Sequence, residues 1–162
     1  GLTLNIPDAT GLVADLGGGS LEVVALKAGE VQHSTSFNFG HLSDVDEDNV
    51  ADALAATPWI ADTGGGRIYG VGGSFRALGL AYIEQTGYPL PVLHGLRISG
   101  REASLLLSAF CRESPDLACF PLVRHKPMPM AASIIPALLR QSGATRLFVG
   151  GTSIRDVLNA DR

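Results

Sequence analysis

Short apolar runs separated by glycine turns dominate the start of the chain and predict a small antiparallel sheet. Residues 11–16 and 21–27 flank three consecutive glycines, and the second run alternates in the period-2 pattern of a half-buried strand. A third alternating stretch follows over residues 30–39, after the Ala28-Gly29 turn. Three strands joined by such short connections predict an antiparallel meander.

Beyond the meander, helical spacing of apolar residues alternates with short strand-like runs. Helices are expected over residues 46–56, 75–86, 101–112, 131–142 and 153–159. Strands are expected over residues 67–71 and 146–149, and residues 92–98 predict only a short irregular strand. Pro136 lies inside the fourth helical pattern, so we expect it to kink that helix or to shift its start.

This order of elements predicts an α/β fold made of one domain over residues 1–162. A meander followed by alternating helices and strands is the pattern of the ribonuclease-H-like half-domain. We therefore expect a five-stranded mixed sheet, with an antiparallel three-strand meander and helices on both faces.

Composition supports a packed domain, since 46% of the residues are apolar and only 17% are charged. No apolar run reaches the roughly 18–20 residues that cross a membrane, and no basic-then-apolar leader is seen, so we expect a cytoplasmic protein. Cys111 and Cys119 match no metal-binding spacing and are expected to be reduced thiols.

The acidic and basic residues are unevenly distributed along the chain. Residues 1–66 hold ten of the 16 acids and a single base, Lys27. A general polyanion surface, such as one that binds nucleic acid, is therefore not indicated, and any anion site must be local. The basic cluster at Arg124, His125 and Lys126 is either a solvated surface or a contact to phosphates, and the sequence leaves its role open.

The glycine turn after the first strand carries the strongest chemical signal. Gly17, Gly18, Gly19 and Ser20 exceed what a two-residue hairpin turn needs, and converging amides without Cβ atoms form a nest for phosphate oxygens. Asp15 and Glu22 bracket this turn, and two carboxylates beside a phosphate call for a cation such as Mg²⁺. The alternative is a glycine-rich hairpin with two solvated acids, and the local pattern leaves both interpretations open.

Two further glycine turns follow later strands. Gly72-Gly73-Ser74 leads from a strand into a helix, an arrangement typical of anion sites at helix N-termini or of close helix–strand packing. Gly150-Gly151-Thr152 follows the last strand. Turns at the carboxyl ends of strands gather at one edge of an α/β sheet, so we expect all three to line one cleft.

Several segments together resemble the exopolyphosphatase / guanosine pentaphosphate phosphohydrolase (Ppx/GppA) family of the actin, Hsp70 and sugar-kinase superfamily. The matching segments occur in the family's order and cover nearly the whole chain. They are residues 11–22, 69–78, 86–95 and 128–132, and the last strand with residues 150–156, whose Gly-Gly-Thr-Ser-Ile-Arg-Asp departs from the family's usual Gly-Leu-Arg-Glu-Gly.

The resemblance implies that the chain is the second, C-terminal domain of a two-domain phosphatase core whose active site lies between the domains. It implies Mg²⁺-dependent hydrolysis of the terminal phosphoanhydride of inorganic polyphosphate. Gly17 to Ser20 would hold the phosphates, Asp15 and Glu22 would orient the metal and the attacking water, and Gly72, Gly73 and Ser74 would line the inner cleft. The general base and the other phosphate loop are expected in the first domain, so the fragment alone is expected to be inactive.

Other functions remain open at this stage. The substrate could be guanosine pentaphosphate, from which the 5′ phosphate would be removed. The chain could also be a non-catalytic actin- or Hsp70-like nucleotide-binding module, because residues 149–153 resemble the Hsp70 adenosine turn. A sugar or acid kinase half-domain and a pure interaction domain are further alternatives. The oligomeric state is not indicated, and a homodimer is one assembly that stays open.

Overall fold

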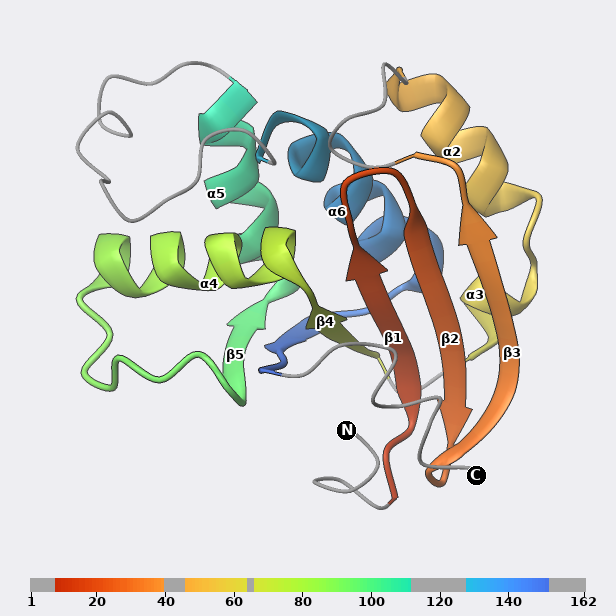
Figure 1. Cartoon of the computed structure of the whole chain (residues 1–162), viewed down its shortest axis with the longest axis horizontal. Helices are drawn as coiled ribbons and strands as arrows, with labels where there is room; N and C mark the ends of the chain where they lie inside the picture. The colour runs from red at the N-terminus through yellow and green to blue at the C-terminus, as the bar shows by residue number, and fades with distance from the viewer. Residues whose placement is uncertain (1–7, 40–45, 64–65, 112–127, 152–162) are drawn as a thin grey trace.

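The computed structural model describes residues 8–39, 46–63, 66–111 and 128–151. Its centre is a six-stranded mixed sheet in the order β3-β2-β1-β4-β6-β5. The strands are β1 (Gly11–Leu16), β2 (Leu21–Lys27), β3 (Glu30–Phe37), β4 (Arg67–Val71), β5 (Leu96–Ser99) and β6 (Arg146–Val149). Figure 1 shows β1, β2 and β3 side by side as the predicted antiparallel meander, while β4 and β6 continue the sheet parallel to β1.

The predicted count of five strands is wrong, because β5 is a genuine strand at the sheet edge. It pairs antiparallel with β6, so that Leu96 lies opposite Val149 and Ser99 opposite Arg146. Leu96 and Ile98 are buried while Arg97 is exposed. Four residues give only two apolar positions, too few for a clear period-2 signal after the proline-rich segment that precedes them. The meander also differs slightly from expectation, since β3 ends at Phe37 and its register shifts near Ala25 and Leu26.

Five helices are described: α2 (Glu47–Ala55), α3 (Trp59–Asp62), α4 (Gly73–Thr86), α5 (Gly100–Cys111) and α6 (Met128–Ser142). The short α3 is not among the predicted helices, because its four residues are too few to show helical spacing. Proline has no amide hydrogen to lose at a helix start, and Pro58 caps α3. Pro136 lies inside α6 without delaying its start, which falls three residues earlier than predicted.

All the described helices pack on one face of the sheet. Their buried side chains join those of Leu12, Leu21, Ile68 and Leu147 in the main core. The opposite face carries a smaller core that contains only strand and loop residues, among them Val13, Val24 and Tyr69, in the described part of the chain. The expected helices on both faces are therefore seen on one face only, and the helix predicted at residues 153–159 lies outside the described residues.

Other sequence predictions also fall outside the described part. These are the basic cluster of Arg124, His125 and Lys126, and Cys119. Among the residues that the structure describes, no helix is both long and apolar enough to traverse a lipid bilayer.

Helix α5 begins with a reciprocal capping pair, and its contribution to stability should depend on pH. The Ser99 hydroxyl and amide both donate to Glu102 Oε2, at 2.6 and 3.1 Å, and the Glu102 amide donates to Ser99 Oγ at 3.2 Å. These hydrogen bonds lower the pKa of the Glu102 carboxyl. Because its pKa is lower in the folded state, the carboxylate stabilises the fold above its unfolded pKa, and that share is lost as the pH falls through the folded pKa.

We therefore expect Ser99→Ala to destabilise the domain by about 1 kcal/mol at pH 7. The difference from wild type should shrink in acid, as the pH falls through the folded pKa of Glu102. Urea unfolding at pH 7 and at pH 3 measures both values. An equal difference at the two pH values would show that the carboxylate contributes nothing through Ser99.

Candidate functional site

Asp15 and Glu22 lie directly opposite each other at the end of the β1–β2 hairpin. The two residues are cross-strand partners in the antiparallel register, so their side chains project from the same face of the sheet. Both are half-buried. Like charges in this arrangement repel, and the pairing therefore favours a cation between or beside the two carboxylates.

The turn at residues 17–20 joins these two acids. The Gly17 amide donates to the Ser20 carbonyl at 2.9 Å, which closes the hairpin. The expectation that all four amides of the turn are available to phosphate is therefore wrong for Gly17. Within the described chain, the Gly18 and Gly19 amides have no protein acceptor.

A positive φ requires none of the glycines in this turn, and packing does not require Gly17 or Gly19. None of the three glycines at 17–19 has a positive φ. A Cβ on Gly17 would come no nearer than 3.7 Å to another atom, and a Cβ on Gly19 would meet nothing within 4 Å. The space beside Gly17 and Gly19 is open, so the lack of side chains there leaves the backbone accessible to a ligand.

The second predicted loop lies against the first. Gly72, with φ of 89°, caps the N-terminus of the 14-residue helix α4, and a Cβ there would overlap the Asp15 carboxylate. This close approach requires glycine at position 72. Asp15 therefore lies beside the N-terminal amides of α4, where backbone N–H groups and the helix dipole favour negative charge.

Ser74 ties the two loops together. Its side chain is only 1% exposed, and its hydroxyl donates to the Leu16 carbonyl at 3.1 Å. The hydroxyl is thus occupied within the protein, where it holds the start of α4 against the end of β1. Gly73, by contrast, has nothing within 4 Å of a hypothetical Cβ and faces open space.

The third glycine turn lies at the same edge, after β6. The Gly150 amide donates to the Gly70 carbonyl at 2.7 Å, and the Gly151 amide donates to His94 Nδ1 at 3.1 Å. Because β1, β4 and β6 are parallel, the structure brings all three turns to one sheet edge, as expected. The hydrogen bond between the Gly151 amide and His94 was not predicted, since nothing in the local sequence pairs residue 94 with a turn 57 positions later.

The donor set near the turn fits a hydrated divalent cation and not a closed metal site. Among the described residues, no group of three or more His, Cys, Asp or Glu side chains could hold a metal ion. Asp15 and Glu22 supply two carboxylates, and Mg²⁺ typically completes its shell with waters and substrate phosphate oxygens. The residues therefore fit Mg²⁺ only together with an oxyanion ligand.

Comparison with known proteins defines the fold. No protein-family model and no curated protein matches the sequence. A Ppx/GppA family member from Aquifex aeolicus is similar in structure, with a TM-score of 0.71 and 20% identity over 99% of this chain and 58% of that one. An exopolyphosphatase from Cytophaga hutchinsonii gives a TM-score of 0.77 and 19% identity, over 99% of this chain and 59% of that one.

The strand order and the glycine turns gathered at one edge define a ribonuclease-H-like α/β domain. More particularly, the chain has the fold of the Ppx/GppA proteins, over nearly its whole length, as the sequence resemblance predicted. It spans less than two thirds of the solved chains that it matches.

Proposed function

We propose that this chain forms one half of the active site of an exopolyphosphatase-type hydrolase, which releases terminal phosphate from inorganic polyphosphate. The other half would come from a further domain of the same protein, corresponding to the part of the solved chains that this chain does not match. One of those similar proteins is an exopolyphosphatase. The structural likeness supports the fold, and the site residues support the chemistry.

The observation that carries the proposal is the pair of glycines that the fold does not need. Gly19 and Gly73 lie at the edge shared by the two loops, and each faces open space where a side chain would fit without any internal clash. Glycine costs conformational entropy, so its presence at both positions calls for another reason. Close approach of a phosphate chain to the backbone amides is such a reason.

The chain's own groups would divide the work as follows. The amides of Gly18, Gly19 and Ser20 and the N-terminus of α4 would bind phosphate oxygens, while Ser74 keeps the two loops together. Asp15 and Glu22 would hold Mg²⁺, which when bound neutralises phosphate charge. Their remaining lone pairs would orient a water molecule toward the terminal phosphorus. Such a site contributes mainly positioning and electrostatic stabilisation, as is general for phosphoryl transfer.

Gly19→Ala tests this assignment in the chain itself. We expect the variant to be as stable as wild type or slightly more stable, because the methyl meets no atom and glycine's unfolded-state entropy is reduced. We also expect it to bind tripolyphosphate in the presence of Mg²⁺ about tenfold more weakly, since the methyl occupies the space of a phosphate oxygen. Isothermal titration calorimetry and thermal unfolding measure the two effects.

A control for this experiment is available on the same chain. Gly143→Ala changes a left-handed glycine at the end of α6, away from the site, and should reduce stability without changing the affinity of the folded protein for tripolyphosphate. Unchanged affinity in Gly19→Ala would contradict the assignment of the turn.

Phosphate release distinguishes the split site from its alternatives. Incubated alone with polyphosphate and Mg²⁺, the chain is expected to release no phosphate, and clear turnover would refute the need for a second domain. If the two-domain protein hydrolyses guanosine pentaphosphate in preference to polyphosphate, guanosine pentaphosphate is its substrate. Thermal protection by ATP without protection by polyphosphate would favour a nucleotide-binding module.

A further inference from the structure

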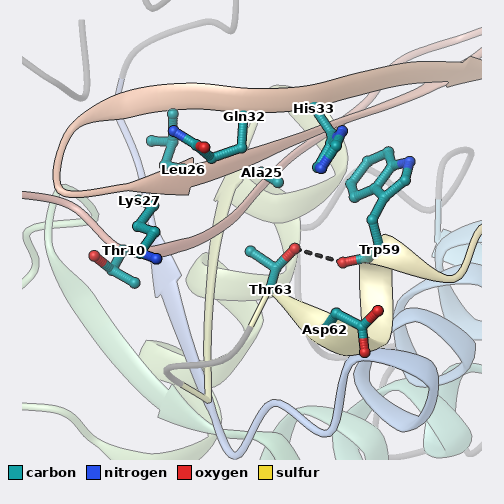
Figure 2. A pocket seen from close by; sticks show the side chains of 9 residues that line it. All are labelled: Thr10, Ala25, Leu26, Lys27, Gln32, His33, Trp59, Asp62 and Thr63. Carbon is teal, nitrogen blue, oxygen red and sulfur yellow. Dashed lines mark hydrogen bonds between the residues drawn. The ribbon is translucent and has the colours of Figure 1, made fainter.

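A cavity lies at the opposite end of the β1–β2 hairpin from Asp15 and Glu22. Its volume is about 420 Å³, within the range of small-molecule sites. The lining residues come from the residue before β1, from β2 and β3, and from α3 and its C-cap: Thr10, Ala25, Leu26, Lys27, Gln32, His33, Trp59, Asp62 and Thr63 (Figure 2). Thr10 directly precedes β1 and is five residues from Asp15, or about 16 Å in extended chain, so this cavity is separate from the proposed phosphate site.

Its two charged side chains, Lys27 and Asp62, come from opposing walls and have opposite charges. Figure 2 shows Lys27 and Gln32 on the strands and Asp62 on α3 across the cavity. Within the described residues, neither Lys27 nor Asp62 has an ion-pair partner. Lys27 can only donate hydrogen bonds, the carboxylate of Asp62 can only accept them, and the Gln32 amide does both.

An aromatic wall completes the site. The rings of His33 and Trp59 stack at a centroid distance of 5.5 Å and an interplanar angle of 22°. Thr63 holds α3 in shape, because its hydroxyl donates to the Trp59 carbonyl at 2.5 Å. The face of an aromatic ring is negatively polarised and attracts C–H groups that carry partial positive charge.

We propose that this cavity binds a neutral polyhydroxylated ligand, a mono- or disaccharide. A sugar hydroxyl both donates and accepts, so hydroxyls on opposite sides of one sugar would bind Asp62 and Lys27 at once, while the C–H face of the ring would lie on the aromatic wall. One positive and one negative side chain cancel, and a neutral ligand needs no further countercharge. A nucleotide with two phosphate charges would find one cation opposed by a carboxylate, so it fits this lining less well.

The chain carries its own reporter for this binding, because Trp59 is its only tryptophan. We expect saturable changes in tryptophan fluorescence on titration with glucose, galactose, N-acetylglucosamine or maltose. Asp62→Ala and Gln32→Ala should each lower the affinity for the sugar that binds best about tenfold, because hydrogen bonds to its hydroxyls are lost. Asp52→Ala, a change of an exposed acid on α2, is the matched control and should leave the affinity unchanged.

Sugar binding at this cavity is expected to be independent of the proposed phosphate site. Glu22→Gln should bind the sugar as wild type does, so failure of either proposal is distinguishable from failure of the other. Circular dichroism melting verifies that each variant is folded. Absence of a saturable change with every sugar, a response to AMP or to free amino acids alone, or equal effects of Asp62→Ala and Asp52→Ala would each overturn the assignment.

Discussion

Glu22→Gln is expected, under the proposed function, to reduce polyphosphate hydrolysis by the proposed two-domain protein roughly 10²–10³-fold, the order of effect of removing one preorganised electrostatic group. The substitution keeps the size of the side chain and removes its charge. Glu22 lies at the start of β2 with its side chain opposite Asp15, so the loss acts on the carboxylate pair and not on the core. The activity that remains should require a higher Mg²⁺ concentration, because one anionic ligand is gone.

Two measurements separate this role from a structural one. Thermal unfolding of Glu22→Gln without ligand should match wild type or exceed it slightly, since the repulsion from Asp15 is relieved. Glu84→Gln, an exposed carboxylate on α4, should leave both rate and Mg²⁺ dependence unchanged. A Glu22→Gln enzyme with wild-type turnover at every Mg²⁺ concentration would remove Glu22 from the site.

Gly70→Ala is expected to destabilise the domain by about 3 kcal/mol, the upper part of the range for overpacking a core. Gly70 lies in β4 with ordinary φ, so the cost is steric and not conformational. A Cβ at this position would overlap the ring of Phe75, which is fully buried in the first turns of α4. Urea unfolding measures the loss.

A double-mutant cycle attributes that loss to one contact. Phe75→Ala removes the ring, so adding Gly70→Ala to it should cost much less than in wild type, with a coupling free energy of about 1–3 kcal/mol. Gly73→Ala, two residues before Phe75, adds a methyl that meets nothing and should be neutral or stabilising. Purely additive effects of the two substitutions would show that the strain lies elsewhere.

Local patterns were sufficient to predict the elements around the candidate site. The hairpin of residues 11–16 and 21–27 has the predicted bounds, because two strands joined by a glycine turn are specified by alternation and turn chemistry alone. The placement of Asp15 and Glu22 on one face follows from the same hairpin register. The gathering of the glycine turns at one edge follows from parallel strand pairing, which the alternation of helices and strands indicates.

The features that the sequence did not predict depend on contacts between distant parts of the chain or on the positions of single atoms. β5 exists because β6 pairs with it, and four residues carry too little pattern of their own. The use of the Gly17 amide within the turn, and of the Ser74 hydroxyl by Leu16, depends on the position of single atoms that no periodicity specifies. The cavity near Trp59 likewise combines side chains from three strands or their flanks and an unpredicted helix.

The hydrogen bond from Ser74 to the Leu16 carbonyl has a mechanical consequence. It joins the end of β1 to the first turn of α4, so that the two glycine loops are held next to each other. In the proposed two-domain protein, the other domain would therefore meet both loops at a separation that this bond helps to fix.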